Sequence, residues 1–322
     1  MPGQVLATSY KVKLNDGNEI PALGLGGAAP ESDHERFKDA LKAAIRSGIR
    51  HIDTAWYYNT EHIIGAALKE LIDAGEIKRE DLFITTKVWP SLWDKAEYSL
   101  DQSLKDLQTD YVDLFLQHWP ITYRKSETGI PPNPTDSNGV LQFDTEADYL
   151  DTYKQLIKLR DNTKKVKSIG VSNFTEKHLQ RAIDETGVVP AVEQVELHPR
   201  LPQKKLVEFA ESKGIKVEAF SPAGSSGAPL IKEPLVVKLS EKYEVSPNSV
   251  LNSYHILSGR IVLPRSSNAE RVKTFIELAP LTEDELKELD QLGIDNPKRF
   301  INDDWGVPLG FEHWKTKFSW ES

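Results

Sequence analysis

The sequence predicts an α/β fold, a (β/α)8 barrel in which eight parallel strands alternate with eight helices. Three observations support this fold class. Short apolar segments alternate with segments that repeat apolar residues at helical spacing, and this alternation is typical of a parallel sheet. The unit occurs eight times, which allows the sheet to close. No stretch rich in Pro, Gly or Ser divides the 322 residues near the middle, so we expect one domain over residues 1–322 instead of a doubly wound open sheet.

A β-hairpin is expected before the barrel, because residues 10–14 and 19–23 alternate in polarity around a turn-like segment, Asn15-Asp16-Gly17-Asn18. We expect this hairpin to cover one end of the barrel. The strand and helix pairs have these expected ranges: 22–26 with 37–45, 49–53 with 60–73, 82–88 with 94–107, 111–118 with 148–160, 166–171 with 175–185, 191–196 with 203–213, 216–220 with 234–243, and 261–263 with 269–277. The expected additions are a long loop after the fourth strand (120–144), an extra helix (247–257), and a helix (283–292) before a C-terminal tail with Trp305, Phe311, Trp314, Phe318 and Trp320.

The composition narrows the classes of function. The net charge is −9 with Lys and Arg dispersed among acids, so the broad basic face of a nucleic-acid-binding protein is not expected. The chain has no Cys, which excludes disulfides, thiolate metal ligands and a Cys nucleophile, and which favours a reducing compartment. No segment offers the roughly 20 apolar residues of a membrane span, and the first residues lack a secretion signal. We expect a cytoplasmic protein; the sequence does not indicate its oligomeric state.

The sequence also contains residues that could be interpreted as a dinucleotide-binding turn or as a metal site, but their spacing argues against both. Residues 24–29 have the G-x-G-x-x-A spacing of a dinucleotide-binding turn, but Pro30 follows where that motif needs its helix to begin. A metal site would use His51, His118 and His198, yet no two of them are spaced as ligands on one element. We therefore expect neither a Rossmann turn nor a bound metal.

Four polar side chains are expected to meet at the carboxyl ends of the strands, where barrels of this kind carry their functional residues. Asp53 ends the second strand and Tyr58 follows it, while Lys87 and His118 end the third and fourth strands. Each residue alone has a simpler explanation, such as a turn former, a rim aromatic, a solvated cation or a packed histidine. Their occurrence at consecutive strand ends indicates a common site.

These four residue types suit the reduction of a carbonyl group. A phenol has an ordinary pKa of about 10, and a nearby Lys cation lowers this pKa. Asp53 would keep Lys87 charged and directed at Tyr58, which acts as general acid, while His118 donates a second hydrogen bond to the same oxygen. Side chains cannot supply hydride, so a nicotinamide cofactor is implied. We interpret Tyr57 as a packing residue.

Six motifs follow one another along the chain. They are Leu23-Gly24-Leu25-Gly26, His51-Ile52-Asp53-Thr54-Ala55 with Tyr58, Thr85-Thr86-Lys87, Val112-Asp113-Leu114, Ile169-Gly170-Val171-Ser172-Asn173-Phe174 and Leu263-Pro264-Arg265-Ser266. In this order they resemble the aldo-keto reductases, and the resemblance covers nearly the whole chain. Residues 78–90, 117–120 and 148–156 are similar to the yeast branch of NADP-dependent D-arabinose dehydrogenases.

The resemblance implies a catalytic tetrad of Asp53, Tyr58, Lys87 and His118, in agreement with the set derived from the strand ends. It also implies NADP(H) as the cofactor, because arginine pairs well with the 2′-phosphate. The family pattern places these residues against the cofactor: Phe220 on the nicotinamide, Ser172, Asn173 and Gln194 on its carboxamide, Ser221, Gly224 and Ser225 along the pyrophosphate, and Arg265, Ser266 and Arg271 around the 2′-phosphate.

The chain departs from the family pattern at three positions. Gly27 and Ala28 stand where the family often has Thr and a bulky aromatic, and Ala223 stands where Leu is common. All three changes remove side-chain volume, two beside the substrate and one near the cofactor. We therefore expect a pocket that accepts bulky ketones, keto esters or diketones and whose remaining walls are Trp56, Trp89 and Trp119.

The activity that the resemblance implies is reversible hydride transfer between NADPH and a carbonyl or sugar substrate, with oxidation of an aldose such as arabinose as the reverse reaction. Some barrels of this family are non-catalytic regulatory or structural proteins that bind NADP(H), and the presence of all four catalytic residue types argues against that role. An aldolase or isomerase would use Lys87 as a Schiff-base nucleophile, which the neighbouring Asp53 disfavours by keeping the amine charged.

Overall fold

The computed structural model describes residues 5–125, 129–302 and 309–314 of the chain. Trp305, Phe318 and Trp320 of the expected aromatic tail lie outside the described residues, whereas Phe311 and Trp314 lie within them. In the described part of the chain, no helix is both long and apolar enough to cross a membrane.

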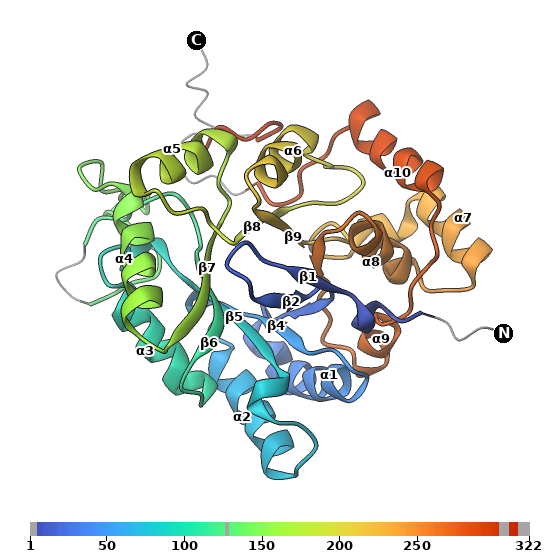
Figure 1. Cartoon of the computed structure of the whole chain (residues 1–322), viewed down its shortest axis with the longest axis horizontal. Coiled ribbons are helices and arrows are strands. Elements are labelled where there is room, and N and C mark those ends of the chain that lie inside the picture. Colours follow the sequence, from blue (N-terminus) through green and yellow to red (C-terminus); the bar gives the residue numbers. More distant parts are fainter. Residues whose placement is uncertain (1–4, 126–128, 303–308, 315–322) are drawn as a thin grey trace.

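Eight parallel strands form the barrel, as Figure 1 shows. In chain order they are β3 (Gly24–Gly26), β4 (His51–Asp53), β5 (Phe83–Val88), β6 (Val112–Gln117), β7 (Val166–Ser172), β8 (Val192–Glu196), β9 (Lys216–Phe220) and β10 (Ile261–Leu263). Each strand pairs with the next one along the chain. The first and last strands also meet, because Val262 N donates to Ala22 O at 2.8 Å and Gly26 N donates to Pro264 O at 2.9 Å. The predicted fold class is confirmed.

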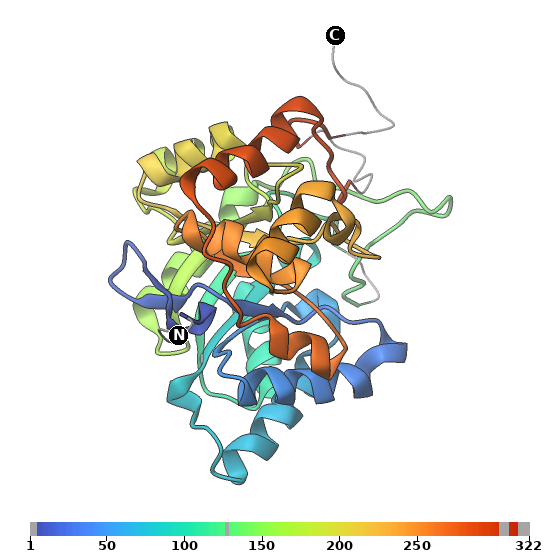
Figure 2. The same cartoon turned by 90° about the vertical axis from the view of Figure 1, so that its right-hand side faces the viewer.

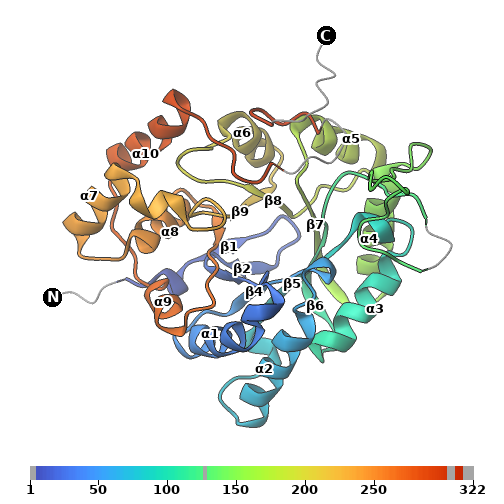
Figure 3. The ribbon, with the colours of Figure 1, turned by 180° about the vertical axis from the view of Figure 1, so that it is seen from behind.

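Helices surround the sheet in the views from both ends of the barrel (Figure 1, Figure 3). They are α1 (His34–Arg46), α2 (Glu61–Asp73), α3 (Ala96–Leu107), α4 (Tyr149–Asn162), α5 (Glu176–Thr186), α6 (Lys204–Ser212), α7 (Pro234–Tyr243), α8 (Pro247–Leu257), α9 (Ala269–Thr274) and α10 (Glu283–Asp295). Helix α1 shows how the sequence builds this layer. Phe37, Leu41 and Ala44 recur every three or four residues and are buried, so one face of the helix packs into the core between helices and sheet.

The predicted N-terminal hairpin is present as β1 (Lys11–Lys13) and β2 (Glu19–Pro21), which pair antiparallel. It lies across the end of the barrel where the strands begin (Figure 1). Asn15 Nδ2 donates to Pro190 O at 2.8 Å, just before β8, and Asn18 Nδ2 donates to Ser168 Oγ at 3.0 Å on β7. Ile20 packs in a cluster with side chains from the barrel interior. The opposite end, at the carboxyl ends of the strands, is therefore the one left for a site.

The additions to the barrel occur where the sequence predicts them. Helix α8 has the predicted bounds, α10 continues three residues beyond the predicted end at 292, and α9 ends at Thr274 instead of 277. The long loop after β6 is not extended coil throughout, because Tyr123 bridges to Phe143 and Thr135 bridges to Leu141. Figure 2 shows this loop, in green, extending from the side of the barrel. The described part of the chain also contains short 3-10 helices: η1 (Ala7–Ser9), η2 (Glu31–Asp33), η3 (Trp56–Tyr58), η4 (Arg79–Asp81), η5 (Pro90–Leu92) and η6 (Pro229–Lys232).

Candidate active site

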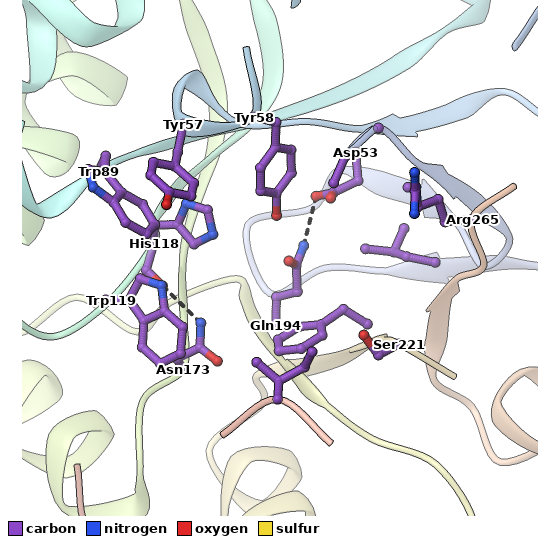
Figure 4. A pocket seen from close by; sticks show the side chains of 16 residues that line it. Asp53, Tyr57, Tyr58, Trp89, His118, Trp119, Asn173, Gln194, Ser221 and Arg265 are labelled. Atoms are coloured by element: carbon purple, nitrogen blue, oxygen red, sulfur yellow. Dashed lines mark hydrogen bonds between the residues drawn. The ribbon is translucent and has the colours of Figure 1, made fainter. Parts of the chain in front are cut away.

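A cavity of about 260 Å³ lies at the carboxyl ends of the strands, and we call it the tetrad cavity (Figure 4). Asp53, Tyr58 and His118 line it. Lys87 lies against Asp53 and has no exposed surface. The structure thus brings together the four residues that the sequence singled out at consecutive strand ends.

The Lys87 ammonium is held in one position by oxygen atoms on β4 and just after it. Nζ donates to Asp53 Oδ1 at 2.7 Å, to Asp53 Oδ2 at 2.8 Å and to Thr54 O at 2.8 Å. Its distance to the Tyr58 hydroxyl oxygen is 3.4 Å. Asp53 is the last residue of β4 and Lys87 points inward from β5, while η3 returns Tyr58 over both. Two adjacent parallel strands and one turn of 3-10 helix therefore suffice to assemble this part of the site.

Burial and the neighbouring charges shift the pKa values of Lys87 and Tyr58 in opposite directions. Burial alone would lower the pKa of Lys87, but Asp53 and Tyr58 raise it above its ordinary value, so the ammonium is charged at neutral pH. Burial raises the pKa of the Tyr58 phenol, and the lowering effect of Lys87 does not cancel this increase. The sequence-based expectation of a lowered phenol pKa is therefore wrong in net direction. Tyr58 holds its proton at neutral pH, and Lys87 limits the cost of losing it.

His118 follows β6 and is neutral in this cavity. Burial, and then the charge of Lys87, hold the pKa of His118 well below its ordinary range. Its ring lies edge-on to that of Tyr58, with 5.6 Å between the centroids. Nδ1 has no hydrogen-bond partner among the described residues. A neutral imidazole can donate one hydrogen bond but has no excess proton to transfer, which distinguishes His118 from Tyr58.

Two amide side chains form the floor beside the tetrad. Gln194 Nε2 donates to Asp53 Oδ1 at 2.8 Å, and Asn173 Nδ2 donates to His118 O at 3.0 Å, as Figure 4 shows. Asn173 has φ of 61°, a left-handed conformation that Asn tolerates better than most residues. Ser172 donates its hydroxyl to Gln194 O at 2.8 Å and does not line the tetrad cavity. Among the expected carboxamide contacts, Asn173 and Gln194 thus line the cavity and Ser172 lies behind them.

Aromatic side chains form the outer walls of the tetrad cavity. Tyr57 stacks on Trp89 with 3.6 Å between the ring centroids, and Trp89 Nε1 donates to Pro132 O at 2.6 Å on the long loop. Trp119 completes this side of the lining. Trp56 was expected as a wall, but it packs against the core clusters and is not among the lining residues described. Tyr57, interpreted from the sequence as packing, lines the cavity instead.

Gly27 and Ala28 both line the tetrad cavity, but they differ in what a larger side chain would meet. A Cβ on Gly27 would lie 2.6 Å from Asp53 O, and Gly27 N donates to that same oxygen at 2.7 Å. The missing side chain at Gly27 therefore lets the backbone approach β4 and does not enlarge the cavity, contrary to the expectation from sequence. Ala28 is the position at which reduced volume faces the cavity.

A second, larger cavity of about 640 Å³ adjoins the first, and we call it the polar cavity. The two share Ala28, Ser221, Leu263 and Arg265 in their linings. The polar cavity also contains the following residues that the family pattern places against the cofactor: Ser225, Ser266 and Arg271. Phe220 lies in the lining of the tetrad cavity.

Gly224 does not line either cavity, yet its place in the loop after β9 requires glycine. Its φ is +81°, and a Cβ there would lie 2.7 Å from the ring of Phe300. Ala223 lines the polar cavity, which is where the sequence analysis expected its reduced side-chain volume.

The polar cavity fits the phosphate groups of a dinucleotide. Arg265 and Arg271 contribute guanidinium groups that form no ion pair within the described chain, and the buried hydroxyl of Ser267 has no hydrogen-bond partner there. Unpaired cations and an orphaned hydroxyl in a polar cavity suit an anionic ligand. Because the two cavities adjoin and share lining residues, one elongated molecule can place its phosphates in the polar cavity and its reacting end in the tetrad cavity beside Tyr58.

The three histidines considered as metal ligands have separate environments. His51 Nε2 lies 3.1 Å from Thr85 Oγ1 inside the barrel, and His198 Nε2 lies 3.0 Å from Glu196 Oε1. Within residues 5–125, 129–302 and 309–314, no group of three or more His, Asp or Glu side chains is placed to hold a metal ion.

Sequence reasoning missed Ile301 and Ser267, which line these cavities. Ile301 lines the tetrad cavity because Glu196 accepts the backbone N–H groups of Phe300 at 2.7 Å and Ile301 at 3.0 Å, which holds the C-terminal segment over the barrel. Ser267 lines the polar cavity directly after the Arg265-Ser266 motif. The one signal in the sequence is an acid, Glu196, at the end of a predicted strand, and the sequence does not indicate which backbone groups this carboxylate binds.

Comparison with known proteins agrees with this geometry. The sequence model of the Aldo/keto reductase family matches residues 22–294. The chain is 39% identical over 312 residues to the D-galacturonate reductase of Hypocrea jecorina, covering 95% of this chain and 99% of that protein. It is 38% identical over 313 residues to the glycerol 2-dehydrogenase (NADP(+)) of Saccharomyces cerevisiae, covering 95% and 98%. The solved aldose reductase of Schistosoma japonicum has a TM-score of 0.83 and 34% identity, covering 90% of this chain and 94% of that chain.

The family match spans all eight barrel strands, and both relatives align over nearly their whole length. The polar cavity suits the phosphates of the cofactor that such enzymes use, and the tetrad cavity suits a small carbonyl compound. The chain therefore belongs to the aldo/keto reductase family and is an NADP(H)-dependent oxidoreductase that acts on carbonyl groups.

Proposed function

We propose that this enzyme reduces aldehydes, ketones, keto esters or diketones reversibly, with Tyr58 as the general acid. The observation that carries this proposal is the contact between the Tyr58 hydroxyl and the Lys87 ammonium, 3.4 Å apart, at the base of a cavity walled by aromatic rings. Asp53 binds the ammonium through both carboxylate oxygens. Tyr58 is therefore the protonated group of the site, and the phenolate that forms when it loses its proton has the Lys87 ammonium beside it.

In the proposed mechanism the substrate oxygen lies between Tyr58 and His118. The neutral imidazole of His118 donates a hydrogen bond and orients the carbonyl. As negative charge develops on the oxygen, Tyr58 transfers its proton, and Lys87 stabilises the phenolate that remains. NADPH supplies the hydride when it is bound. In the reverse direction the Tyr58 phenolate accepts the proton of an alcohol.

Lys87 is proposed to act through its charge and not as a nucleophile. All three hydrogens of the ammonium group are within hydrogen-bond distance of oxygen acceptors, two on Asp53 and one on Thr54. A Schiff base requires a neutral amine with a free lone pair. The geometry therefore supports reductase chemistry over an aldolase or isomerase.

The substrate class follows from the cavity walls. Ala28 leaves room at the entrance, and the flat rings of Trp89 and Trp119 suit aromatic or extended ketones. The names of the relatives, a D-galacturonate reductase and a glycerol 2-dehydrogenase, support hydroxylated carbonyl compounds as a further group. Oxidation of an aldose such as arabinose stays a prediction, as does the cytoplasmic location. We further propose that the barrel and its additions work as one domain.

A substrate panel tests this proposal. We expect the purified protein to consume NADPH with aryl ketones and diketones at rates at least comparable to those with short aliphatic aldehydes. A non-catalytic binding protein would bind NADPH, observed by quenching of Trp fluorescence, and would consume none with any of these compounds. A strict preference for the smallest aldehydes would contradict the proposed pocket while leaving the reductase assignment in place.

The proposed cofactor site predicts that Arg271→Ala weakens selection for NADPH over NADH. Arg271 lines the polar cavity from α9, and a charge-assisted hydrogen bond to phosphate is worth about 1.5–3 kcal/mol, so KM for NADPH should rise roughly 10- to 100-fold. KM for NADH, which has no 2′-phosphate, should change little. The measurement is steady-state KM for both cofactors with one carbonyl substrate.

Lys273→Ala is the matched control for this prediction. Lys273 lies on the same helix, but its ammonium pairs with Glu270 at 2.6 Å and it does not line the polar cavity. This variant should leave both KM values unchanged. An equal rise in KM for NADPH and NADH in Arg271→Ala would remove Arg271 from the 2′-phosphate site.

A further inference from the structure

Glu218 is a buried carboxyl group beneath the tetrad that the proposed mechanism does not use. It lies on β9, and its side chain has no exposed surface. Charged and titratable groups face it from the other side of the barrel: His51 and Asp53 on β4, Lys87 on β5 and Tyr58 on the turn after β4. Glu218 Oε1 lies 3.5 Å from His51 Nε2 and has no hydrogen-bond partner among the described residues.

Gln194 on β8 joins Glu218 to the tetrad. Its Nε2 donates to Glu218 Oε2 at 2.7 Å and to Asp53 Oδ1 at 2.8 Å. Since both hydrogens of this amide group are used, the orientation of the side chain is fixed. No described residue donates a hydrogen bond to its side-chain oxygen, so this oxygen is available to a ligand in the tetrad cavity, which Gln194 lines.

The environment of Glu218 favours its neutral form at physiological pH. Burial is the main cause that raises the pKa of Glu218 to about 8, and the Asp53 carboxylate acts in the same direction against Gln194 and Lys87. His51 offers no counter-charge, because burial lowers the pKa of its imidazole to about 3. Lys87 is already bound by Asp53.

We propose that Glu218 is a positioning residue, which holds the Gln194 amide oxygen toward the cofactor and, as a neutral acid, keeps a second negative charge away from Lys87 and Tyr58. Loss of its proton places a carboxylate beneath the tetrad. That charge raises the pKa of Tyr58 and makes the phenol a weaker proton donor. This inference rests on the proposed role of Tyr58 and on the expectation from sequence that Gln194 binds the carboxamide of the nicotinamide.

The first test is the pH dependence of kcat/KM for carbonyl reduction. In the wild-type enzyme we expect a decrease with an inflection near pH 8, where Glu218 ionises. Glu218→Gln imitates the neutral acid: its side-chain oxygen can still accept from Gln194, but it cannot ionise. At pH 7 the kcat/KM of this variant should lie within about threefold of the wild-type kcat/KM. Its pH profile should lack the inflection, because only the titrating proton is removed.

A second variant tests the contact with Gln194. Glu218→Leu removes one of the two acceptors of the Gln194 amide group, which is then held by Asp53 alone, so its contact with the cofactor is weakened. We expect the dissociation constant for NADPH to increase roughly tenfold, a typical effect of losing one buried hydrogen bond. Circular dichroism establishes that the variant is folded.

Glu193→Gln is the matched control. Glu193 is a second buried carboxyl group, on β8, which accepts from Phe174 N at 2.8 Å and does not contact the tetrad. Its pKa is also raised well above the ordinary range by burial. The pH profile of this variant should retain the inflection near pH 8. The inflection would then be assigned to the ionisation of Glu218 and not to that of any buried carboxyl group.

The outcomes separate this inference from the proposed function. A Glu218→Gln enzyme that keeps the inflection, a wild-type enzyme that lacks it, or a loss of most of the activity at pH 7 in Glu218→Gln would each overturn the role of Glu218. An unchanged dissociation constant in folded Glu218→Leu would overturn the contact through Gln194. Failure of the wild-type enzyme to reduce any carbonyl compound would instead contradict the proposed function.

Discussion

Tyr58→Phe is expected to lower kcat for carbonyl reduction by about 10²- to 10⁴-fold, the usual contribution of a general acid. The substitution removes only the hydroxyl that lies 3.4 Å from Lys87 Nζ and leaves the ring that packs edge-on against His118. Binding of NADPH should be retained, because the polar cavity is untouched. The measurements are steady-state kcat and a fluorescence titration with NADPH.

Tyr57→Phe provides a control in the same cavity. Tyr57 also lines the tetrad cavity, but its hydroxyl accepts a hydrogen bond from Asn133 Nδ2 at 3.1 Å instead of contacting Lys87. Its removal should change kcat by less than about threefold, since this hydrogen bond is exposed and worth little. Equal losses in the two variants would show that the cavity requires phenols in general and would contradict the specific role of Tyr58.

Lys87→Met is expected to affect both stability and activity. The substitution leaves the Asp53 carboxylate buried without its cation, and breaking a buried pair in this way costs about 3–5 kcal/mol of unfolding free energy. The phenolate of Tyr58 also loses its counter-charge, so kcat should fall even where the protein is fully folded. Urea denaturation measures the unfolding free energy. The effect on catalysis is measured as kcat at low temperature, where the variant is folded.

Lys167→Met is the control for the stability effect. Lys167 also binds an aspartate, Asp113, at 2.8 Å, but its side chain is 48% exposed and Asp113 keeps its contact with Arg79 at 2.9 Å. Because the Lys167 ammonium is half exposed and Asp113 keeps a second cation, loss of this pair should cost about 0–1 kcal/mol. Comparable destabilisation by the two substitutions would mean that the Asp53–Lys87 pair behaves as a surface contact.

The barrel could be predicted from the sequence because its periodicities are local. The apolar residues Leu82, Phe83 and Ile84 begin a short segment that the structure buries as a strand, while α1 repeats apolar residues at helical spacing. The tetrad followed from the rule that the carboxyl ends of parallel strands meet at one end of a barrel. The order of the strands was therefore enough to predict that Asp53 and Lys87 lie close together.

Features that depend on contacts across the barrel could not be predicted in the same way. The net direction of the Tyr58 pKa depends on how completely the cavity removes water, which the chain does not encode locally. The sequence suggested that Gly27 enlarges the substrate cavity, but a Cβ at this position would collide with the backbone oxygen of Asp53. Glu218 is an acid in a short strand, and only the closed barrel shows that it shares Gln194 with the tetrad.

The central claim is that Lys87 acts on the reaction through the Tyr58 phenol. A double-mutant cycle tests it by comparing single-turnover reduction rates of cofactor-saturated wild type, Tyr58→Phe, Lys87→Met and the double variant. Because no phenolate forms without the Tyr58 hydroxyl, the double variant should be no slower than Tyr58→Phe alone, within about twofold. If the two losses instead multiply, the two residues contribute independently, and the proton-donating unit described above does not exist.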